Sequence, residues 1–302
     1  MIRYDILKYS ATLFLTFTGL TPSEFEILSV SFKEALKNSV VRESVERKDR
    51  KRKYGGGRKP KLRKDEDKLL FILVYFKLYP LQAVIGYFFE MSQSQASEWI
   101  YRLSDVLKTA LEISDCLPER NPENLRSVLL KDGADEVAID GAERRIQRPK
   151  DPEKQKKCYS GKKRMHSVKN DTVVTVRGRK AIYLSRTCEG KKHDKKICDE
   201  ENPTFPEGIV LYKDTGFQGY EPEGVIAQQP KKKPRGGQLS RAEKNQNRII
   251  SGVRIVAEHV ISGIKRSRIV KDIFRNTKEK YDDLVMEIAC GLHNFRNEMR
   301  SA

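Results

Sequence analysis

Residues 137–141 read Val-Ala-Ile-Asp-Gly, and residues 209–216 read Ile-Val-Leu-Tyr-Lys-Asp-Thr-Gly. Each stretch is a short apolar run, typical of a buried strand, that leads directly to an aspartate, Asp140 or Asp214. In an open α/β sheet, ligands bind at the carboxyl ends of the strands, so two aspartates in this position can share one site. Either stretch alone is better explained by an aspartate that begins a turn.

Strand patterns continue around these two runs. A β-branched run predicts a strand at Thr172–Val176, and Ala181–Leu184 is a further candidate. Helical periodicity returns after Ser240, which forms a capping-box pattern with Glu243. We therefore expect an α/β domain with a long C-terminal helical part.

A glutamate on the C-terminal helix is the third candidate ligand. Apolar residues recur there at intervals of three and four and predict a buried stripe formed by Ile249, Val253, Val256, Val260 and Ile264. Glu258 lies beside that stripe, between Arg254 and Lys265. A glutamate in this position is more often a solvated helix residue. Carboxylates buried together nevertheless need a cation or a proton, and divalent metal ions with oxygen ligands meet that need.

The N-terminal half is predicted to be helical. A capping box at Thr21–Glu24 begins a helix that we expect to end near Glu43. Helices at Asp65–Leu78 and Leu81–Phe89 follow, and a tight polar break then leads into a longer helix capped by Ser92, as a helix-turn-helix requires. Side chains able to bond base edges or phosphates begin that longer helix: Gln93, Ser94, Gln95 and Ser97. A small helical bundle that does not read DNA is the alternative.

The charge of the chain favours a polyanionic partner. Lys and Arg number 60 against 42 Asp and Glu, which gives a formal net charge of +18. Eleven basic residues and one acidic residue fall between Arg47 and Lys64, and the glycines and proline among them disfavour a helix. This segment is either a DNA-contacting arm or a solvated linker. The arm residues expected to contact DNA are Arg50, Lys51, Arg52, Lys53, Arg58 and Lys59.

Several classes of protein are disfavoured. The five cysteines are scattered without a CxxC pair, which argues against a disulfide framework and a zinc knuckle. The apolar run at Ala11–Leu20 is too short to span a bilayer and lacks a signal-peptide cleavage pattern, so we expect a cytoplasmic protein with no membrane partner. The sequence does not show the aromatic-rich RNP strands of common RNA-binding modules.

Taken in order, four blocks of the sequence resemble the catalytic region of DDE transposases from bacterial insertion sequences, in the IS-five-like group. The blocks are 140–149 with 159–166, 190–194, 211–220, and 254–259. The resemblance covers the whole catalytic half and extends to the preceding helix-turn-helix. Two positions depart from the family pattern: Ala142 stands where a hydroxyl residue is common, and Ala257 where valine is common. Both bear on local packing or a secondary contact rather than on the ligands.

The resemblance implies a ribonuclease-H-like catalytic domain, a mixed sheet flanked by helices, after an all-α helix-turn-helix domain. Asp140 would lie centrally, Asp214 on the neighbouring strand and Glu258 on a following helix. Together they would hold two Mg²⁺ or Mn²⁺ ions about 4 Å apart, which activate the attacking oxygen and stabilise the leaving oxygen. His193 and Asp194 either support these ligands from behind, or Asp194 caps a helix that starts at Lys195, which we favour.

The expected function is that of a DNA transposase acting on double-stranded DNA, both element termini and target, as a homodimer at the bacterial nucleoid. Further residues expected to contact DNA are Lys162, Lys163, Arg164, Lys231, Lys232, Lys233 and Arg235. The expected divisions are a helical region (1–46), a basic arm (47–64), the helix-turn-helix (65–125) and the catalytic domain (126–302). The alternatives are an endonuclease without strand transfer and an inactive or domesticated DNA-binding protein.

Overall fold

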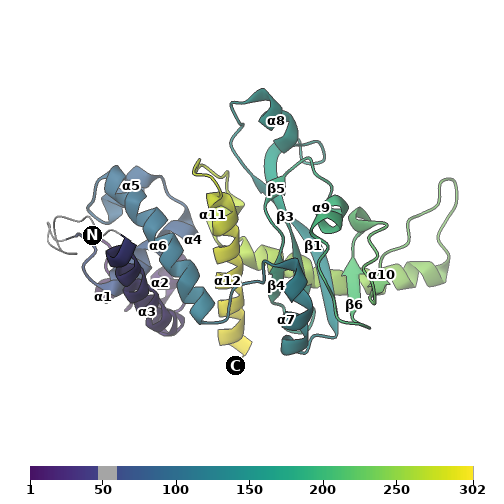
Figure 1. Cartoon of the computed structure of the whole chain (residues 1–302), viewed down its shortest axis with the longest axis horizontal. Coiled ribbons are helices and arrows are strands. Elements are labelled where there is room, and N and C mark those ends of the chain that lie inside the picture. The colour runs from purple at the N-terminus through teal and green to yellow at the C-terminus, as the bar shows by residue number, and fades with distance from the viewer. Residues whose placement is uncertain (47–59, 302) are drawn as a thin grey trace. The chain divides into compact units, whose positions relative to one another are not determined.

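The computed structural model describes residues 1–46 and 60–301, which belong to two compact units (Figure 1). The helical unit contains residues 1–117, 266–270 and 284 onward, and the sheet unit contains residues 118–265 and 271–283. This division follows the packing of the chain. The expected boundaries of the DNA-reading and catalytic parts are assignments of function, and they stay predictions.

Within the described residues of the helical unit, all the regular structure is helical. Its elements are α1 (Tyr4–Leu7), α2 (Ala11–Thr18), α3 (Pro22–Glu46), α4 (Asp65–Leu78), α5 (Gln82–Phe88), α6 (Gln93–Ile113), α11 (Arg268–Lys271) and most of α12 (Tyr281–Ser301). Helix α4 is buried on every side from Leu69 to Phe76 and packs against α2, α3 and α6, so it is the core of this unit. The capping box predicted at Thr21 with Glu24 is present, and Ser92, predicted to cap the longer helix, forms a capping box with Gln95.

The turn between α5 and α6 is set by a glycine. The Met91 backbone N–H donates to the carbonyl oxygen of Gly86 over 2.9 Å, and Phe89 packs edge-to-face against Phe71 of α4. A Cβ atom on Gly86 would lie 2.7 Å from the Met91 carbonyl oxygen, closer than real Cβ atoms approach. The tight break expected between the two helices is therefore present, and it depends on this residue.

A mixed sheet is the core of the other unit. Its strands are β1 (Glu136–Arg145), β2 (Tyr159–Ser160), β3 (Met165–Thr175), β4 (Ala181–Leu184), β5 (Cys188–Glu189), β6 (Val210–Lys213) and β7 (Ile226–Gln228). Strand β1 lies between β3, to which it is antiparallel, and β6, to which it is parallel, while β7 extends the sheet beyond β6. The expected α/β architecture, with a ribonuclease-H-like sheet after a helical region, is confirmed.

Helices and short turns cover this sheet. They are a 3₁₀ turn at Pro122–Asn124, α7 (Leu125–Asp132), α8 (Pro152–Cys158), α9 (Asp194–Glu201), a second 3₁₀ turn at Thr215–Phe217, and α10 (Arg241–Ile264). Apolar residues of α7, β1, β3, β4, α9 and β6 form one buried cluster. Helix α10 packs against β1, β3 and β6. No helix in the described residues is both long and apolar enough to cross a membrane.

The buried stripe predicted on α10 is wrong at its first position. Ile249 is 62% exposed, whereas Ile250 is buried, and Ala257, Val260, Ile261 and Ile264 complete the covered face. Two adjacent isoleucines satisfy the helical period equally well, and only the position of the sheet decides which of them is covered.

Candidate active site

The unpaired edge of β1 positions the first candidate ligand. Strand β6 pairs with β1 only as far as Lys213 opposite Ile139, while β1 continues to Arg145 along β3. Asp140 is thus the first residue of β1 beyond the end of β6. Asp214 follows β6 directly, and its carboxylate accepts a hydrogen bond from the Gly216 backbone N–H at the start of a 3₁₀ turn.

Helix α10 supplies the third candidate ligand to the same place. Asp140, Asp214 and Glu258 all line one pocket of about 1020 Å³ in the sheet unit. Arg254, one turn before Glu258, lies in this pocket with a guanidinium nitrogen 3.7 Å from a carboxylate oxygen of Asp214. Residues separated by more than a hundred positions therefore converge as the sequence predicts, although their roles are not decided by position alone.

The carboxylates influence one another electrostatically. The pKa of Asp140 is raised to about 6, mainly by burial and also by the charges of Asp214 and Glu258. A hydrogen bond of 2.8 Å from the Gly141 backbone N–H and the charge of Arg254 oppose this rise. Because burial is the largest cause of the rise, the buried carboxyl group favours an added proton or a cation close to it.

Cationic side chains line the same pocket as the carboxylates. Lys162 and Lys163 line it, as expected of residues that contact phosphate, and Lys169, Lys265 and Lys271 line it too. Burial and the charge of Lys163 lower the pKa of Lys265. Carboxylates and ammonium groups in one pocket suit a phosphodiester, because the ammonium groups attract its oxygens while a cation shields the carboxylates.

Asp194 does not cap a helix that starts at Lys195, and this correction changes its place in the site. Helix α9 begins at Asp194 itself, after His193, and the Asp194 carboxylate accepts a hydrogen bond of 2.9 Å from Lys169 Nζ. A Cβ atom on Gly141 would lie 3.2 Å from the Asp194 carboxyl carbon, so the absence of a side chain at that glycine gives the carboxylate its space. His193 and Asp194 both line the pocket.

Lys169 is one of the pocket residues that sequence reasoning missed. It lies on β3 opposite Glu143 of β1, in the part of β3 that precedes the predicted β-branched run. A lysine that is only 12% exposed in a strand is unusual, because an ammonium group rarely loses its water without an anionic partner. The sequence pattern does not indicate that Lys169 lies in a strand, because β3 begins at Met165, before the β-branched run that predicted it.

The donor set fits a divalent cation in its chemistry. Carboxylate oxygens are the ligands that Mg²⁺ and Mn²⁺ prefer, and Asp140, Asp214 and Glu258 supply them in one pocket. Within residues 1–46 and 60–301, however, no three His, Cys, Asp or Glu side chains are grouped closely enough to hold a metal ion. The carboxylates would have to draw together, and Asp214 would have to exchange Arg254 for the cation.

The residues expected to contact DNA lie in several places. Gln93, Ser94 and Gln95 are exposed at the start of α6 and Ser97 is half-buried, although the Gln95 side-chain oxygen already accepts from the Ser92 backbone N–H. The basic loop is exposed at Lys231, Lys232, Lys233 and Arg235. Arg164 is also exposed and lines a neighbouring pocket. The arm residues Arg50, Lys51, Arg52, Lys53, Arg58 and Lys59 lie outside the described residues.

Comparisons with known proteins identify the family of the chain. Residues 139–294 match the family model of the DDE superfamily endonuclease, and residues 60–113 match the helix-turn-helix of DDE superfamily endonuclease. The chain is 28% identical over 284 residues to a probable transposase for insertion sequence element IS702 of Microchaete diplosiphon, covering 93% of this chain and 97% of that relative. No solved structure matches the chain.

Proposed function

The chain belongs to the DDE superfamily of endonucleases, and from that premise we propose that it binds the ends of a mobile DNA element, cleaves them and joins them to target DNA. The single observation that carries this proposal is the convergence of Asp140, Asp214 and Glu258 on one pocket that lysines also line. The similarity to a transposase along nearly the whole chain supports it, because both the helix-turn-helix and the catalytic part are included.

Endonucleases of this superfamily use divalent metal ions, and we propose that Asp140, Asp214 and Glu258 hold two Mg²⁺ or Mn²⁺ ions here. Bound at these carboxylates, the ions would activate the attacking oxygen and stabilise the leaving oxygen of a phosphodiester. The pocket's own residues do the positioning. Lys162 and Lys163 bind the phosphates flanking the scissile bond, and Arg254 neutralises Asp214 until the cation arrives.

The helix-turn-helix supplies binding to DNA in this proposal. Gln93 and Ser94 stand exposed at the start of α6, where a recognition helix meets base edges, and Ser97 lies one turn further on. The basic arm and the loop from Lys231 to Arg235 add phosphate contacts that position the DNA without reading its sequence. Two ends must be joined, so we propose a homodimer on DNA, acting where bacterial DNA lies, at the nucleoid.

A cleavage and joining assay tests the proposal. Linear DNA carrying the element's own termini is incubated with the protein, with and without Mg²⁺ or Mn²⁺, and products are resolved on a denaturing gel. The variant Asp214→Asn keeps the acceptor for the Gly216 N–H but removes the charge, and Asp214→Ala removes both. Asp199→Ala is the matched control, because Asp199 is an exposed aspartate of the same unit, paired with Lys195 outside the pocket.

Each outcome selects one function. Cleaved termini and joined products that need metal, persist in Asp199→Ala and disappear in both Asp214 variants support a transposase. Cleavage without joining identifies an endonuclease that lacks strand transfer. Tight DNA binding by folded protein without any metal-dependent product overturns the catalytic claim and leaves a DNA-binding protein.

A further inference from the structure

A second pocket adjoins the catalytic one and has no role in the chemistry described so far. It has a volume of about 570 Å³, and Arg145 and Met165 line both pockets. Its floor is backbone held by hydrogen bonds: the Ile146 N–H donates to the His166 carbonyl oxygen over 3.0 Å, and the Phe274 N–H to that of Arg145 over 2.9 Å. Three separate segments of the sheet unit are thereby fixed together.

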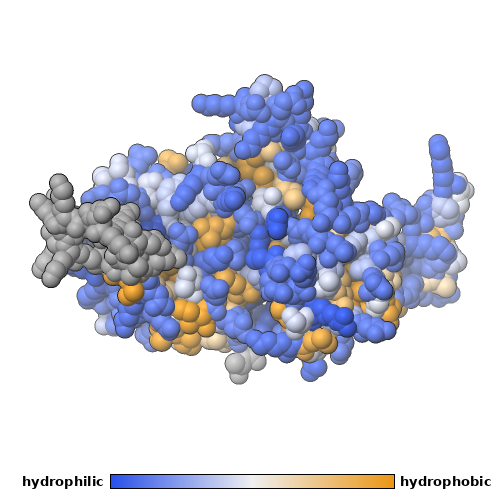
Figure 2. Space-filling view, in the orientation of Figure 1, coloured by the Kyte–Doolittle hydropathy of each residue, from blue (hydrophilic) through white to orange (hydrophobic). Residues whose placement is uncertain are grey.

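Positive charge dominates the lining of this pocket. Arg145, Arg148, Arg164 and Arg275 line it, and no acidic residue does. Gln155 of α8 fixes Arg148 by accepting a hydrogen bond of 2.9 Å from its Nε. Figure 2 shows hydrophilic residues covering α8, at the top of the view. Guanidinium groups present planar arrays of donors that match phosphate oxygens, so this lining attracts a phosphate-bearing ligand.

An aromatic pair gives the same pocket a second kind of contact. Tyr159 of β2 lies opposite His166 of β3, and the two rings meet edge-to-face with centroids 5.4 Å apart and planes at 66°. Tyr159 is 43% exposed, and Ile273, which also lines the pocket, is 39% exposed. A simple phosphate site has no use for exposed aromatic and aliphatic surface, whereas a nucleobase stacks on such surface.

We propose that this pocket binds an unpaired nucleotide of the DNA strand that enters the catalytic pocket, with its base on Tyr159 and its phosphate on the arginines. The volume lies in the range of small-ligand pockets and is too small for a duplex. The shared wall at Arg145 and Met165 puts this nucleotide next to the scissile position. This inference rests on the proposed function, because that function supplies the DNA strand.

Binding of single-stranded oligonucleotides tests the pocket without cleavage. A fluorescein-labelled oligothymidylate and an abasic oligonucleotide of the same length and charge are titrated with full-length protein in EDTA and followed by anisotropy. Tyr159→Phe keeps the ring, Tyr159→Ala removes it, and Tyr9→Ala removes an 83% exposed tyrosine of the helical unit as the control. Thermal denaturation of every variant verifies that it is folded.

The expected result depends on the base. Tyr159→Ala weakens oligothymidylate binding by about 5- to 100-fold, while Tyr159→Phe and Tyr9→Ala stay within about two-fold of wild type. The abasic oligonucleotide binds wild type and Tyr159→Ala equally. An oligothymidylate in which 5-iodouracil replaces one base photocrosslinks to the peptide that carries Tyr159 or His166.

Two results overturn the proposal. One is an abasic oligonucleotide that binds wild type as tightly as oligothymidylate, which indicates phosphate contacts alone. The other is a folded Tyr159→Ala that binds oligothymidylate like wild type. The cleavage assay tests the proposed function separately from the pocket. Base-dependent binding without metal-dependent cleavage would reject the proposed function but leave the nucleotide pocket supported. Metal-dependent cleavage without base-dependent binding would reject only the nucleotide pocket.

Discussion

At the residue scale, the carboxyl group of Asp140 has an ionisation that is strongly changed by its surroundings. Its pKa is raised to about 6 from an ordinary value of 3.8, first by burial and then by the neighbouring charges of Asp214 and Glu258. When the pKa of a carboxyl group is higher in the folded state than in the unfolded state, ionisation of the group lowers the free energy of unfolding. The loss of stability caused by Asp140 is therefore absent below pH 4, grows between pH 4 and 6, and is complete above pH 6.

We therefore predict that Asp140→Asn stabilises the metal-free protein at pH 8, because the amide carries no charge to desolvate. The shift in pKa sets an upper limit of about 3 kcal/mol, and the gain should vanish at pH 4. Thermal denaturation in EDTA measures it. Added Mg²⁺ should raise the melting temperature of wild type and leave that of Asp140→Asn unchanged, and equal responses of the two proteins would contradict a metal role for Asp140.

The three candidate ligands can be named from the sequence because the blocks around them resemble those of DDE transposases, whereas the local pattern of each residue alone favours a structural role. Asp140 and Asp214 follow apolar runs, and Glu258 lies on a helix that begins with a capping box. The contact of Asp194 with Lys169 has no such signal, since it depends on the pairing of β1 with β3 and on the space above Gly141. Contacts between distant residues follow from register, which a single sequence does not reveal.

At the element scale, the turn of the helix-turn-helix depends on Gly86. We predict that Gly86→Ala lowers stability by about 1–3 kcal/mol, because its Cβ would lie 2.7 Å from the Met91 carbonyl oxygen and the turn would have to shift. DNA affinity should fall as well, since α6 would be displaced. Urea denaturation and anisotropy with duplex DNA measure both effects.

Gly252 of α10 provides the matched control for that substitution. A Cβ atom there meets nothing within 4 Å, so Gly252→Ala should stabilise the helix by up to about 1 kcal/mol. Opposite signs for the two alanines are the expected result. Two neutral substitutions would show that the turn at Gly86 has more freedom than its close contact indicates.

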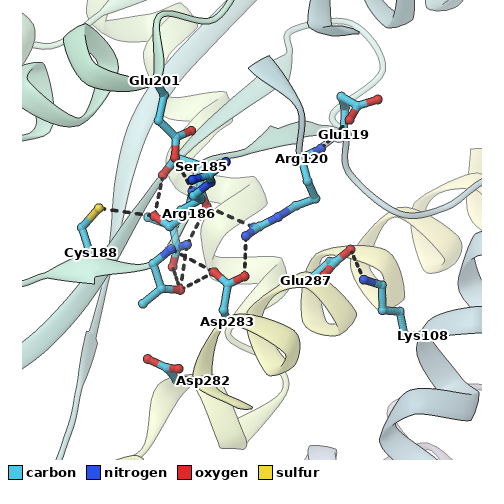
Figure 3. Close-up of polar contacts among 12 residues, drawn as sticks. Lys108, Glu119, Arg120, Ser185, Arg186, Cys188, Glu201, Asp282, Asp283 and Glu287 are labelled. Atoms are coloured by element: carbon cyan, nitrogen blue, oxygen red, sulfur yellow. Dashed lines mark hydrogen bonds and ion pairs between the residues drawn. The ribbon is translucent and has the colours of Figure 1, made fainter. Parts of the chain in front are cut away.

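Asp283, near the start of α12, binds two residues of the sheet unit. Figure 3 shows Asp283 facing Arg120, whose guanidinium nitrogen lies 2.5 Å from one carboxylate oxygen, and Thr187 donates to the other oxygen from its backbone N–H at 2.9 Å and its hydroxyl at 2.6 Å. Burial alone would raise the pKa of Asp283, but Arg120 and Thr187 hold it below its ordinary value.

We predict that Asp283→Asn costs about 1–3 kcal/mol at pH 7. A lowered folded-state pKa gives stability that is present above the unfolded value of about 3.8 and is lost as pH falls through the lower folded value. The difference between wild type and variant should therefore shrink below pH 4. Thermal denaturation from pH 3 to 8 measures it, with Asp282→Asn as the neighbouring control. A difference that is constant with pH would rule out the ionised carboxylate as its cause.

Elements were predicted well where their ends are local. Helix α4 has the expected bounds because its acidic first turn and Pro80 mark them, and β4 likewise matches its short apolar run. Strand β1 is longer than the three apolar residues that predicted it, because its second half is held by β3 rather than by its own pattern. Partner strands extend an element beyond what its own residues indicate.

At the scale of the whole molecule, the chain crosses between its units more than once. Residues 266–270 and most of α12 pack with the N-terminal helices, although the endonuclease family model, which matches residues 139–294, includes residues 266–270 and the first half of α12. Sequence reasoning assigned function in consecutive segments, because composition and charge change along the chain. Which distant helices share a core depends on contacts between residues more than a hundred positions apart, for which local periodicity has no signal.

Charge is the property of the whole molecule that the sequence determines best, and it predicts how DNA binding responds to salt. With a net charge of +18, the affinity for duplex DNA should fall steeply with ionic strength, by about 10³-fold or more from 50 to 200 mM salt if 6–10 phosphates are contacted. If the basic arm makes its share of those contacts, replacing Arg50, Lys51, Arg52, Lys53, Arg58 and Lys59 by serine should flatten the slope of log K against log salt. The slope would change by up to about five, because each phosphate contact contributes about 0.9.

Lys195 and Lys196 provide the control. Each lies beside an acidic partner on α9, so serine at those positions should leave the slope unchanged. Anisotropy titrations at four salt concentrations measure the slopes, and a wild-type slope in the arm variant would identify the arm as a solvated linker rather than a DNA contact.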